Sequence, residues 1–206
     1  MKASKQSLIT LVFIIAILMN ISIVFSNQPS SQLVNLREVN PHILIDLKYA
    51  TPDNFLKQKV YDDPNCYVLA ILAQKLDKAQ KILEQDGLGL KVWDGFRPLS
   101  VQRKMWAIEP DSRFVANPNT GGSIHNRGAA VDLTLVDAEG KELDMPTPFD
   151  SFATRAYQFS KEPTSEQRAH RMLLRQVMEK VGLEPISTEW WHYQLPSGKA
   201  YPVLDR

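Results

Sequence analysis

Residues 123–136 read Ser-Ile-His-Asn-Arg-Gly-Ala-Ala-Val-Asp-Leu-Thr-Leu-Val. From Ala129 to Val136 the segment alternates and is rich in β-branched and apolar residues, which predicts a strand that carries Asp132. His125 precedes this strand on a loop that Gly128 can turn, because glycine adopts a positive φ at no steric cost. We therefore expect His125 and Asp132 to share one pocket, provided that the loop folds back.

Periodicity and end signals outside this stretch predict further helices and strands. Apolar residues at helical spacing predict a helix from Tyr67 to Gln85 that ends at Gly87. A capping box, Thr164 to Gln167, predicts a second helix over Ser165–Val181. The other expected elements are a strand within 34–47, a strand at Leu88–Trp93, a short helix from Pro98 through Trp106, a long loop at Glu109–Gly122 and a strand at Thr188–Leu195. This order predicts an α+β fold, with helices packed on a small, mainly antiparallel sheet.

The chain divides into an N-terminal extension and one domain. Its 206 residues suit a single domain plus a short extension. Residues 8–25 are almost wholly apolar and follow Lys2 and Lys5, so we expect residues 1–26 to be a signal peptide or an N-terminal membrane anchor. Residues 27–33 are interpreted as a linker and 34–206 as the domain. The protein is then expected to be exported, to the periplasm or cell envelope.

Composition excludes some classes of function. The chain is 44% hydrophobic and 23% charged, as globular proteins are, and its formal net charge of +1 argues against a nucleic-acid partner. Cys66 is the only cysteine, so an intrachain disulfide cannot form, and we expect it to be a buried small side chain.

A second segment, Glu189-Trp-Trp-His192, follows Asp132 by about sixty residues. In a regular strand, residues three apart point to opposite faces, so Glu189 and His192 share a site only if the strand starts irregularly or contains a bulge. By spacing alone, a surface glutamate and a core histidine remain the better interpretation. Together, however, the two segments contain what an open zinc site needs, which is three ligands and a carboxylate left off the metal as a base.

The two segments resemble those of the D-alanyl-D-alanine dipeptidases, a family of zinc enzymes that includes the vancomycin-resistance dipeptidase. The resemblance continues in the same order along residues 49–193. The matching segments are Lys48-Tyr-Ala-Thr-x-Asp-Asn-Phe55, Trp93-Asp-Gly-Phe-Arg-Pro98, His125-x-Arg-Gly-x-Ala-x-Asp-Leu-Thr-Leu135, Phe149-Asp150 and Glu189-Trp-Trp-His-Tyr193.

The resemblance implies a role for each of eight residues. It implies one Zn²⁺ per subunit held by His125, Asp132 and His192 at the sheet, Glu189 as general base, Arg97 as stabiliser of the oxyanion, and Tyr49, Ser123 and Asp150 as substrate contacts. Asp150 could hold the free ammonium group of a dipeptide. Without the resemblance, a structural ion pair with Asp94 is an equally good interpretation of Arg97, and a His₂Asp site also accepts other divalent ions.

The resemblance also leaves alternatives. This chain has Phe96 where the family often has tyrosine, and resistance-type members work in the cytoplasm, whereas this chain begins with an expected export segment. The expected reaction is hydrolysis of D-alanyl-D-alanine to two D-alanines, in wall turnover or salvage. The alternatives are a zinc D,D-carboxypeptidase acting on peptidoglycan stem peptides and a non-catalytic zinc module that binds the wall. The loop Glu109–Gly122, with Asp150, would separate the two enzymes by closing the pocket or leaving it open.

Overall fold

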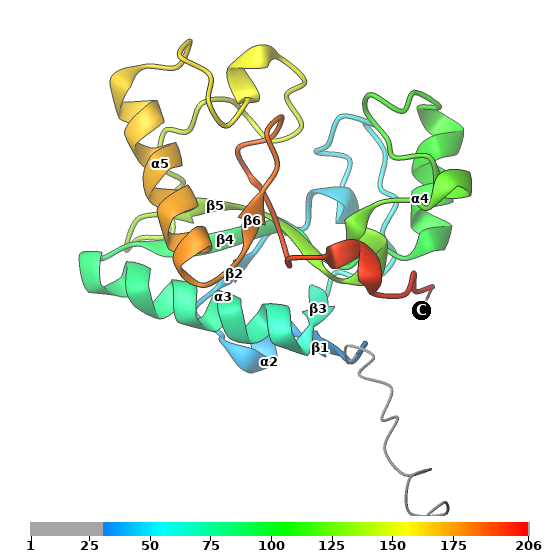
Figure 1. The fold of residues 1–206 in the computed structure, drawn as a ribbon, viewed down its shortest axis with the longest axis horizontal. Coiled ribbons are helices and arrows are strands. Elements are labelled where there is room, and N and C mark those ends of the chain that lie inside the picture. The colour runs from blue at the N-terminus through cyan, green and yellow to red at the C-terminus, as the bar shows by residue number, and fades with distance from the viewer. Residues whose placement is uncertain (1–30, 206) are drawn as a thin grey trace, which may run out of the picture.

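The fold is built on a five-stranded sheet. The structure, a computed structural model, describes residues 31–205. The strand order is β2-β4-β5-β7-β6, with bounds Leu44–Ile45, Gly89–Asp94, Ala130–Val136, His192–Gln194 and Glu184–Pro185 respectively. β2 runs parallel to β4, and the other neighbouring pairs are antiparallel. The predicted α+β class and the small, mainly antiparallel sheet are thus confirmed (Figure 1).

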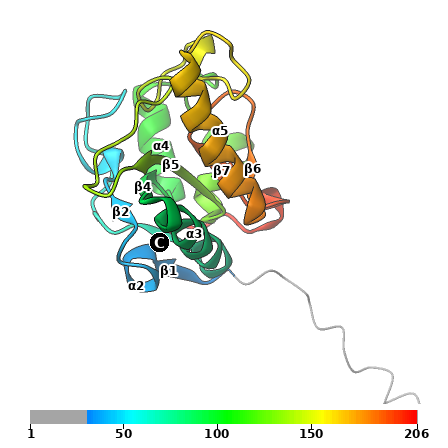
Figure 2. The ribbon, with the colours of Figure 1, turned by 90° about the vertical axis from the view of Figure 1, so that its left-hand side faces the viewer.

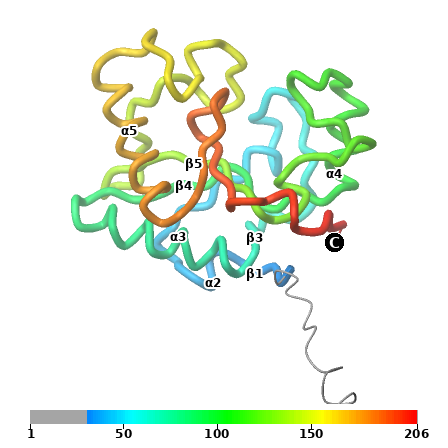
Figure 3. The backbone as a smooth tube through the Cα atoms, viewed as in Figure 1, coloured from blue at the N-terminus to red at the C-terminus, as the bar shows by residue number. Residues whose placement is uncertain are grey.

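Helices and loops surround this sheet. α3 (Ala70–Leu83) and α5 (Ser165–Lys180) contact each other and the sheet, while α4 (Leu99–Ile108) lies at the opposite end of the molecule from α5 (Figures 1 and 2). Two groups of loops stand apart, one beside α5 and one beside α4 (Figure 3). The smaller elements are β1 (Leu33–Asn35), α2 (Leu36–Val39), β3 (Tyr67–Leu69) and the 3₁₀ turns η1 (Lys48–Ala50), η2 (Glu84–Asp86), η3 (Pro118–Thr120), η4 (Ile124–Arg127), η5 (Thr154–Ala156) and η6 (Gly198–Ala200).

Strand β5 lies at the centre of the sheet and is buried along all seven residues. By the alternation of a strand, Val131, Leu133 and Leu135 lie on one face, and Asp132 and Thr134 lie on the other. Because both edges of β5 are paired, Asp132 is fixed between two neighbouring strands.

Three of the residues predicted to start or end helices do so in the structure. The Thr164 hydroxyl accepts a hydrogen bond from the backbone of Gln167, and the Gln167 side-chain oxygen accepts one from the backbone of Thr164, so the capping box at the start of α5 is present. Gly87, with φ +70°, ends the segment that contains α3 and η2. Pro98 is the N-cap of α4. Cys66 is free and buried, as expected.

Three predicted segments differ from the structure by more than two residues at a boundary. The segment 34–47 is not one strand, because the Asn35 side chain accepts from the backbone of Arg37 and starts α2, which leaves only Leu44–Ile45 in the main sheet. The helix predicted from Tyr67 begins at Ala70, because residues 67–69 pair with β1 in a separate two-stranded sheet. The last strand is shorter than Thr188–Leu195, and β6, with which it pairs, was not predicted.

The predicted export segment, residues 1–26, lies outside the described residues. Leu33, the last residue of the predicted linker, is the first residue of β1. Within residues 31–205, none of the helices has the length and apolar character needed to cross a bilayer.

Candidate metal centre and active site

Three neighbouring strands bring polar side chains into one row. Asp132 on β5 pairs with His192 on β7, and with Asp94 on β4 on its other side. The register of β4 against β5 shifts between Val92 and Asp94, which is the irregularity that sets Asp94 opposite Asp132. The site therefore lies at the sheet, at one end of the three strands.

His125 reaches this row from the 3₁₀ turn η4, just before β5. Gly128 ends the turn with φ +64°, so the loop folds back as the sequence required. A β-carbon at Gly128 would lie 2.6 Å from Leu33 Cδ2, and this close approach also demands glycine. The backbone of Arg97 donates to the His125 carbonyl at 3.0 Å, which joins the turn to the loop after β4.

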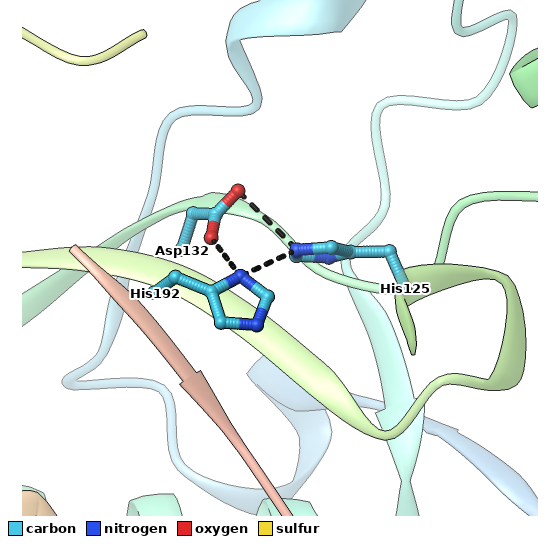
Figure 4. A group of neighbouring side chains, drawn as sticks. All are labelled: His125, Asp132 and His192. Carbon is cyan, nitrogen blue, oxygen red and sulfur yellow. Dashed lines mark hydrogen bonds and ion pairs between the residues drawn. The ribbon is translucent and has the colours of Figure 1, made fainter. Parts of the chain in front are cut away.

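The two histidines and Asp132 point toward one another (Figure 4). His125 Nε2 lies 3.2 Å from His192 Nδ1 and 3.4 Å from Asp132 Oδ2, and His192 Nδ1 lies 3.0 Å from Asp132 Oδ1. His125 Nδ1 faces the Gly95 carbonyl at 2.8 Å, and His192 Nε2 faces Gln194 Oε1 at 3.3 Å. With those nitrogens as donors, each ring directs the lone pair of its other nitrogen toward the carboxylate.

This donor set fits a tetrahedral metal ion. Zinc bonds of 2.0–2.1 Å at tetrahedral angles place ligand atoms about 3.3 Å apart, close to the separations among these three side chains. Two lone pairs and a carboxylate directed at one buried point favour a cation between them. Imidazole and carboxylate donors suit zinc, and three protein ligands leave a position open.

The electrostatics of the pocket agree with this role. Burial alone would raise the pKa of Asp132, but His125 and His192 outweigh burial and hold that pKa well below its ordinary value. Burial alone would lower the pKa of His125, but Asp132 and Asp94 outweigh it and raise that pKa. The two aspartates thus favour positive charge in the pocket. A divalent ion bound there can compensate the negative charge of Asp132 as a protonated histidine does.

Glu189 lies beside the three side chains without joining them. It belongs to the turn before β7, which is the irregular start that the sequence required for Glu189 and His192 to share a site. Glu189 Oε2 is 4.0 Å from His192 Nδ1, and its side chain is 36% exposed. Its pKa is raised, first by burial, with Asp132 adding to the effect. A carboxylate in this position can take up and release a proton nearer neutrality than an ordinary glutamate can.

Arg97 makes the ion pair with Asp94 and also faces the site. One terminal nitrogen lies 2.5 Å from Asp94 Oδ2, and the other donates to Gln102 Oε1 at 3.0 Å. The guanidinium carbon lies 5.1 Å from the centre of the Tyr49 ring. Burial opposes its charge, but Asp94 outweighs burial and the pKa of Arg97 is raised, so the group stays charged. Its buried Nε–H has no hydrogen-bond partner in the described chain.

Asp150 and Tyr49 form a second polar pair in the pocket. The Tyr49 hydroxyl donates to both carboxylate oxygens of Asp150, at 2.9 and 3.1 Å. Burial raises the pKa of Asp150 well above its ordinary value, and Asp132 adds to this shift. A mostly buried carboxylate with no ion-pair partner in the described chain is suited to receive a cationic group.

Ser123 has a local structural contact. Its hydroxyl accepts a hydrogen bond from the backbone of His125 at 3.2 Å, and its backbone donates to Asn126 Oδ1 at 2.7 Å, so it caps the turn η4. Ser123 thereby helps to place His125, and its contact with substrate stays a prediction.

Several supporting residues were not predicted for the site. Asp94 is fully buried and also accepts hydrogen bonds from the Tyr61 hydroxyl and the Gly95 backbone. The motif around Arg97 pointed to Asp94 as an ion-pair partner, but no sequence signal marked Tyr61 or the fully buried Gln102.

Aromatic rings pack against one another next to the candidate site. Trp190 and Trp191 are buried and pack edge to face, as expected of core residues. Phe149 packs against Tyr49 and Trp93. A hollow of about 790 Å³ is lined in part by Trp93 and Phe149, but by none of the eight predicted site residues.

Known proteins resemble this chain along nearly its whole length. Residues 29–204 match the peptidase M15 family described as D-Ala-D-Ala dipeptidase. A D-alanyl-D-alanine dipeptidase of Escherichia coli (strain K12) is 35% identical over 175 residues, which cover 85% of this chain and 90% of the relative. A D-alanyl-D-alanine dipeptidase of Enterococcus faecium is 33% identical over 180 residues, covering 78% and 89%.

A solved structure also shows a distant similarity. The vancomycin-resistance D,D-dipeptidase VanXYg, in complex with a D-Ala-D-Ala phosphinate analogue, has a TM-score of 0.42 and 18% identity, covering 80% of this chain and 66% of the other. The sequence match carries the assignment by itself, and it confirms the resemblance drawn from the motifs: the chain belongs to the D-Ala-D-Ala dipeptidase family of the M15 peptidases.

Proposed function

We propose that this protein is a zinc-dependent dipeptidase that hydrolyses D-alanyl-D-alanine to two D-alanines. The observation that carries the proposal is the meeting, in one pocket, of a His-Asp-His metal site and a carboxylate left off it. Membership of a family whose matching members are D-alanyl-D-alanine dipeptidases supports the substrate.

The metal and the base have separate roles. A zinc ion held by His125, Asp132 and His192 would supply a water with a pKa of about 7 and polarise the scissile carbonyl. Glu189 takes a proton at its carboxylate and passes it to the nitrogen of the departing amine. Because burial raises its pKa, Glu189 takes up the proton more readily near neutral pH than an ordinary glutamate would.

Arg97 stabilises negative charge on the substrate oxygen as the bond breaks. Asp94 and Gln102 hold two of its nitrogens, so the guanidinium is fixed before substrate arrives. A fixed donor in a buried site stabilises developing charge without reorganisation. The ion pair with Asp94 and the catalytic role are therefore compatible.

Asp150 and Tyr49 recognise the free amine of the dipeptide. An ammonium group placed beside Asp150 supplies the cation that its carboxylate lacks, and the Tyr49 hydroxyl holds that carboxylate in place. An N-acylated substrate has no such charge. The pair thus favours a dipeptide with a free amino group over an internal peptide bond.

Three phenylalanines, which we call the aromatic bridge, favour a dipeptidase over a carboxypeptidase. Phe114 lies 4.4 Å from Phe152, and Phe152 lies 5.2 Å from Phe55, between ring centres. Phe114 belongs to the long loop after α4, and Phe152 follows Asp150 by two residues. The loop Glu109–Gly122 is thereby joined to the segment that carries Asp150. We infer that this contact restricts the space beyond the substrate amine.

The reaction is tested with the purified domain and D-alanyl-D-alanine. We expect turnover that a chelator abolishes and that added zinc restores. Glu189→Ala should still bind zinc yet lose most of its turnover, whereas a non-catalytic wall-binding module would show no turnover to lose. Near-normal rates in Glu189→Ala would contradict the assignment of the base.

The choice between the two enzymes is tested with N-acetyl-D-alanyl-D-alanine. Wild type should cleave the free dipeptide and leave the acylated one. Phe152→Ala, which removes a 45% exposed ring from the aromatic bridge, should keep dipeptide turnover and gain activity on the acylated substrate. Ready cleavage of the acylated substrate by wild type would favour the carboxypeptidase and would count against Asp150 as the ammonium site.

We place the enzyme outside the cytoplasmic membrane, with residues 1–26 as a signal peptide or anchor. The support is the apolar run after two lysines. In that compartment the substrate would be dipeptide released by wall turnover. Cell fractionation with N-terminal sequencing tests this: a chain that starts at Met1 in the cytosolic fraction would contradict it.

A further inference from the structure

The turn that carries Glu189 is hydrogen-bonded to a neighbouring segment along its length. Gln158 N donates to the Ser187 carbonyl at 3.0 Å, and Trp190 N donates to the Ala156 carbonyl at 3.0 Å. The Gln158 side chain adds two contacts, because its amide nitrogen lies 3.3 Å from the carbonyl oxygen of Glu189 and 3.2 Å from that of Trp190. One side chain thus binds the carbonyl groups of both peptide groups that flank Trp190, the residue after Glu189.

The segment that holds the turn, residues 155–158, is itself fixed. Arg155 Nε donates to the Pro146 carbonyl at 2.8 Å, and one of its terminal nitrogens donates to Gln167 Oε1 at 2.5 Å. Arg171, on α5, donates to the carbonyl of residue 157 at 2.8 Å, and Ala156 is fully buried. The bonds to the Glu189 turn therefore start from a rigid base.

Gln158 is buried although its amide is only half satisfied. The residue is 3% exposed, and its Oε1 has no hydrogen-bond partner in the described chain. A buried polar atom without a partner costs about 1–3 kcal/mol. Stability alone would therefore favour an apolar side chain of the same size. The reason for an amide here lies in the hydrogen bonds that its nitrogen donates to the Glu189 turn.

We propose that Gln158 is a positioning residue, which holds the turn so that the Glu189 carboxylate stays beside the metal site. The inference rests on the proposed function, because it assigns Gln158 to the support of the general base. Gln158 acts through the backbone of the turn, and the side-chain contacts described for it are with that backbone and with the Tyr193 hydroxyl at 3.4 Å.

Gln80 offers a matched control. It is also a glutamine that is 3% exposed, but both ends of its amide are bonded, to the Leu90 backbone at 2.8 Å and to Glu84 at 3.0 Å. It lies on α3, and its side chain reaches β4 rather than the Glu189 turn. Replacement by methionine keeps the side-chain size and removes the hydrogen bonds at either position.

The test compares Gln158→Met with Gln80→Met in zinc-loaded enzyme. We expect Gln158→Met to lower kcat by about ten-fold or more, because small displacements of a catalytic group are costly, with KM changed by less than about two-fold. Gln80→Met should lose stability and keep kcat. Zinc content should be equal in both variants, and amide exchange should quicken in the peptide that contains Trp190 only in Gln158→Met.

A double-mutant comparison separates positioning from general damage. In a Glu189→Gln background, Gln158→Met should cause no further loss of the residual rate, because the group that it positions is already gone. Gln158→Asn, which keeps the amide on a shorter side chain, should recover part of kcat and serves if the methionine variant does not fold.

Two results would overturn the inference. One is a normal kcat in Gln158→Met, and the other is an equal loss of rate with and without Glu189. Failure of the proposed function is a distinct outcome, since wild type would then leave D-alanyl-D-alanine intact.

Discussion

Two aspartates in the pocket are in opposite electrostatic situations. Asp132 faces two histidines, and its pKa is held low, so it stays ionised as a metal ligand must. Asp150 accepts from Tyr49 but has no cation beside it in the described chain, and burial raises its pKa. The first carboxylate is matched to a permanent cation and the second to one that arrives with the substrate.

The unmatched charge of Asp150 predicts a gain in stability when it is removed. Asp150→Asn should raise the free energy of unfolding at pH 7 by on the order of 1 kcal/mol, as expected when a poorly compensated buried charge is relieved. The same variant should bind the dipeptide more weakly and raise KM. Urea unfolding and steady-state kinetics measure the two effects.

This gain in stability should depend on pH. The folded-state pKa of Asp150 lies above its ordinary value of 3.8, so the ionised group costs stability above the raised pKa. That cost disappears as the pH falls toward 3.8, where the carboxyl becomes protonated in both states. The difference between variant and wild type should therefore shrink on acidification, and a difference that grew would contradict the assignment.

Titration of Glu189 should set the pH at which kcat falls on the acidic side of its pH profile. As a base it works when deprotonated, so kcat should fall as the pH drops through its pKa. Because burial raises that pKa above the ordinary 4.5, the limb should lie above pH 4.5. Measuring kcat against pH tests this, with Glu84→Gln as an exposed control that should leave the limb unchanged. A limb at or below 4.5 would rule out the raised pKa.

At the scale of elements, the sequence predicted the central strand and both long helices because periodic patterns and caps are local. It could not predict that β7 spans only His192–Gln194, because the turn before it depends on bonds to residues 156–158. The pairing of Asp94 with Asp132 depends on a register shift between strands, which no single segment encodes. The candidate metal ligands came from motifs, whereas the proposed supporting role of Gln158 required the tertiary structure.

Adding one methyl group at Gly128, where the turn η4 ends, should lower the stability of the fold. Gly128→Ala should destabilise the fold, because φ is +64° and the new β-carbon would meet Leu33 Cδ2 at 2.6 Å. Gly87→Ala is the matched control, since φ is +70° and nothing lies within 4 Å of its β-carbon. Gly87→Ala should cost about 1 kcal/mol from backbone strain alone.

Gly128→Ala should cost more than Gly87→Ala in the same urea-unfolding assay. It should also weaken zinc binding, because the turn places His125, and Gly87→Ala should not. Equal costs at the two glycines would mean that the close approach to Leu33 relaxes freely.

At the scale of the whole molecule, the proposed metal site joins separate parts of the chain. His125 comes from η4, Asp132 from the centre of the sheet and His192 from the short strand β7. A ligand that binds only the folded state adds RT ln(1 + [L]/Kd) to stability, which is about 4 kcal/mol at a thousand-fold excess over Kd. Zinc should therefore stabilise the domain as a unit.

For a domain of this size, 4 kcal/mol corresponds to a rise in Tm of about 10 °C. Calorimetry with and without chelator measures it. His192→Ala should abolish the zinc-dependent rise, whereas His170→Ala, on the exposed side of α5, should keep it. Because the histidines must be deprotonated to bind metal, the rise should also vanish on acidification. A rise that survived in His192→Ala would show that zinc stabilises the protein from another site, and the three convergent side chains would then need a different explanation.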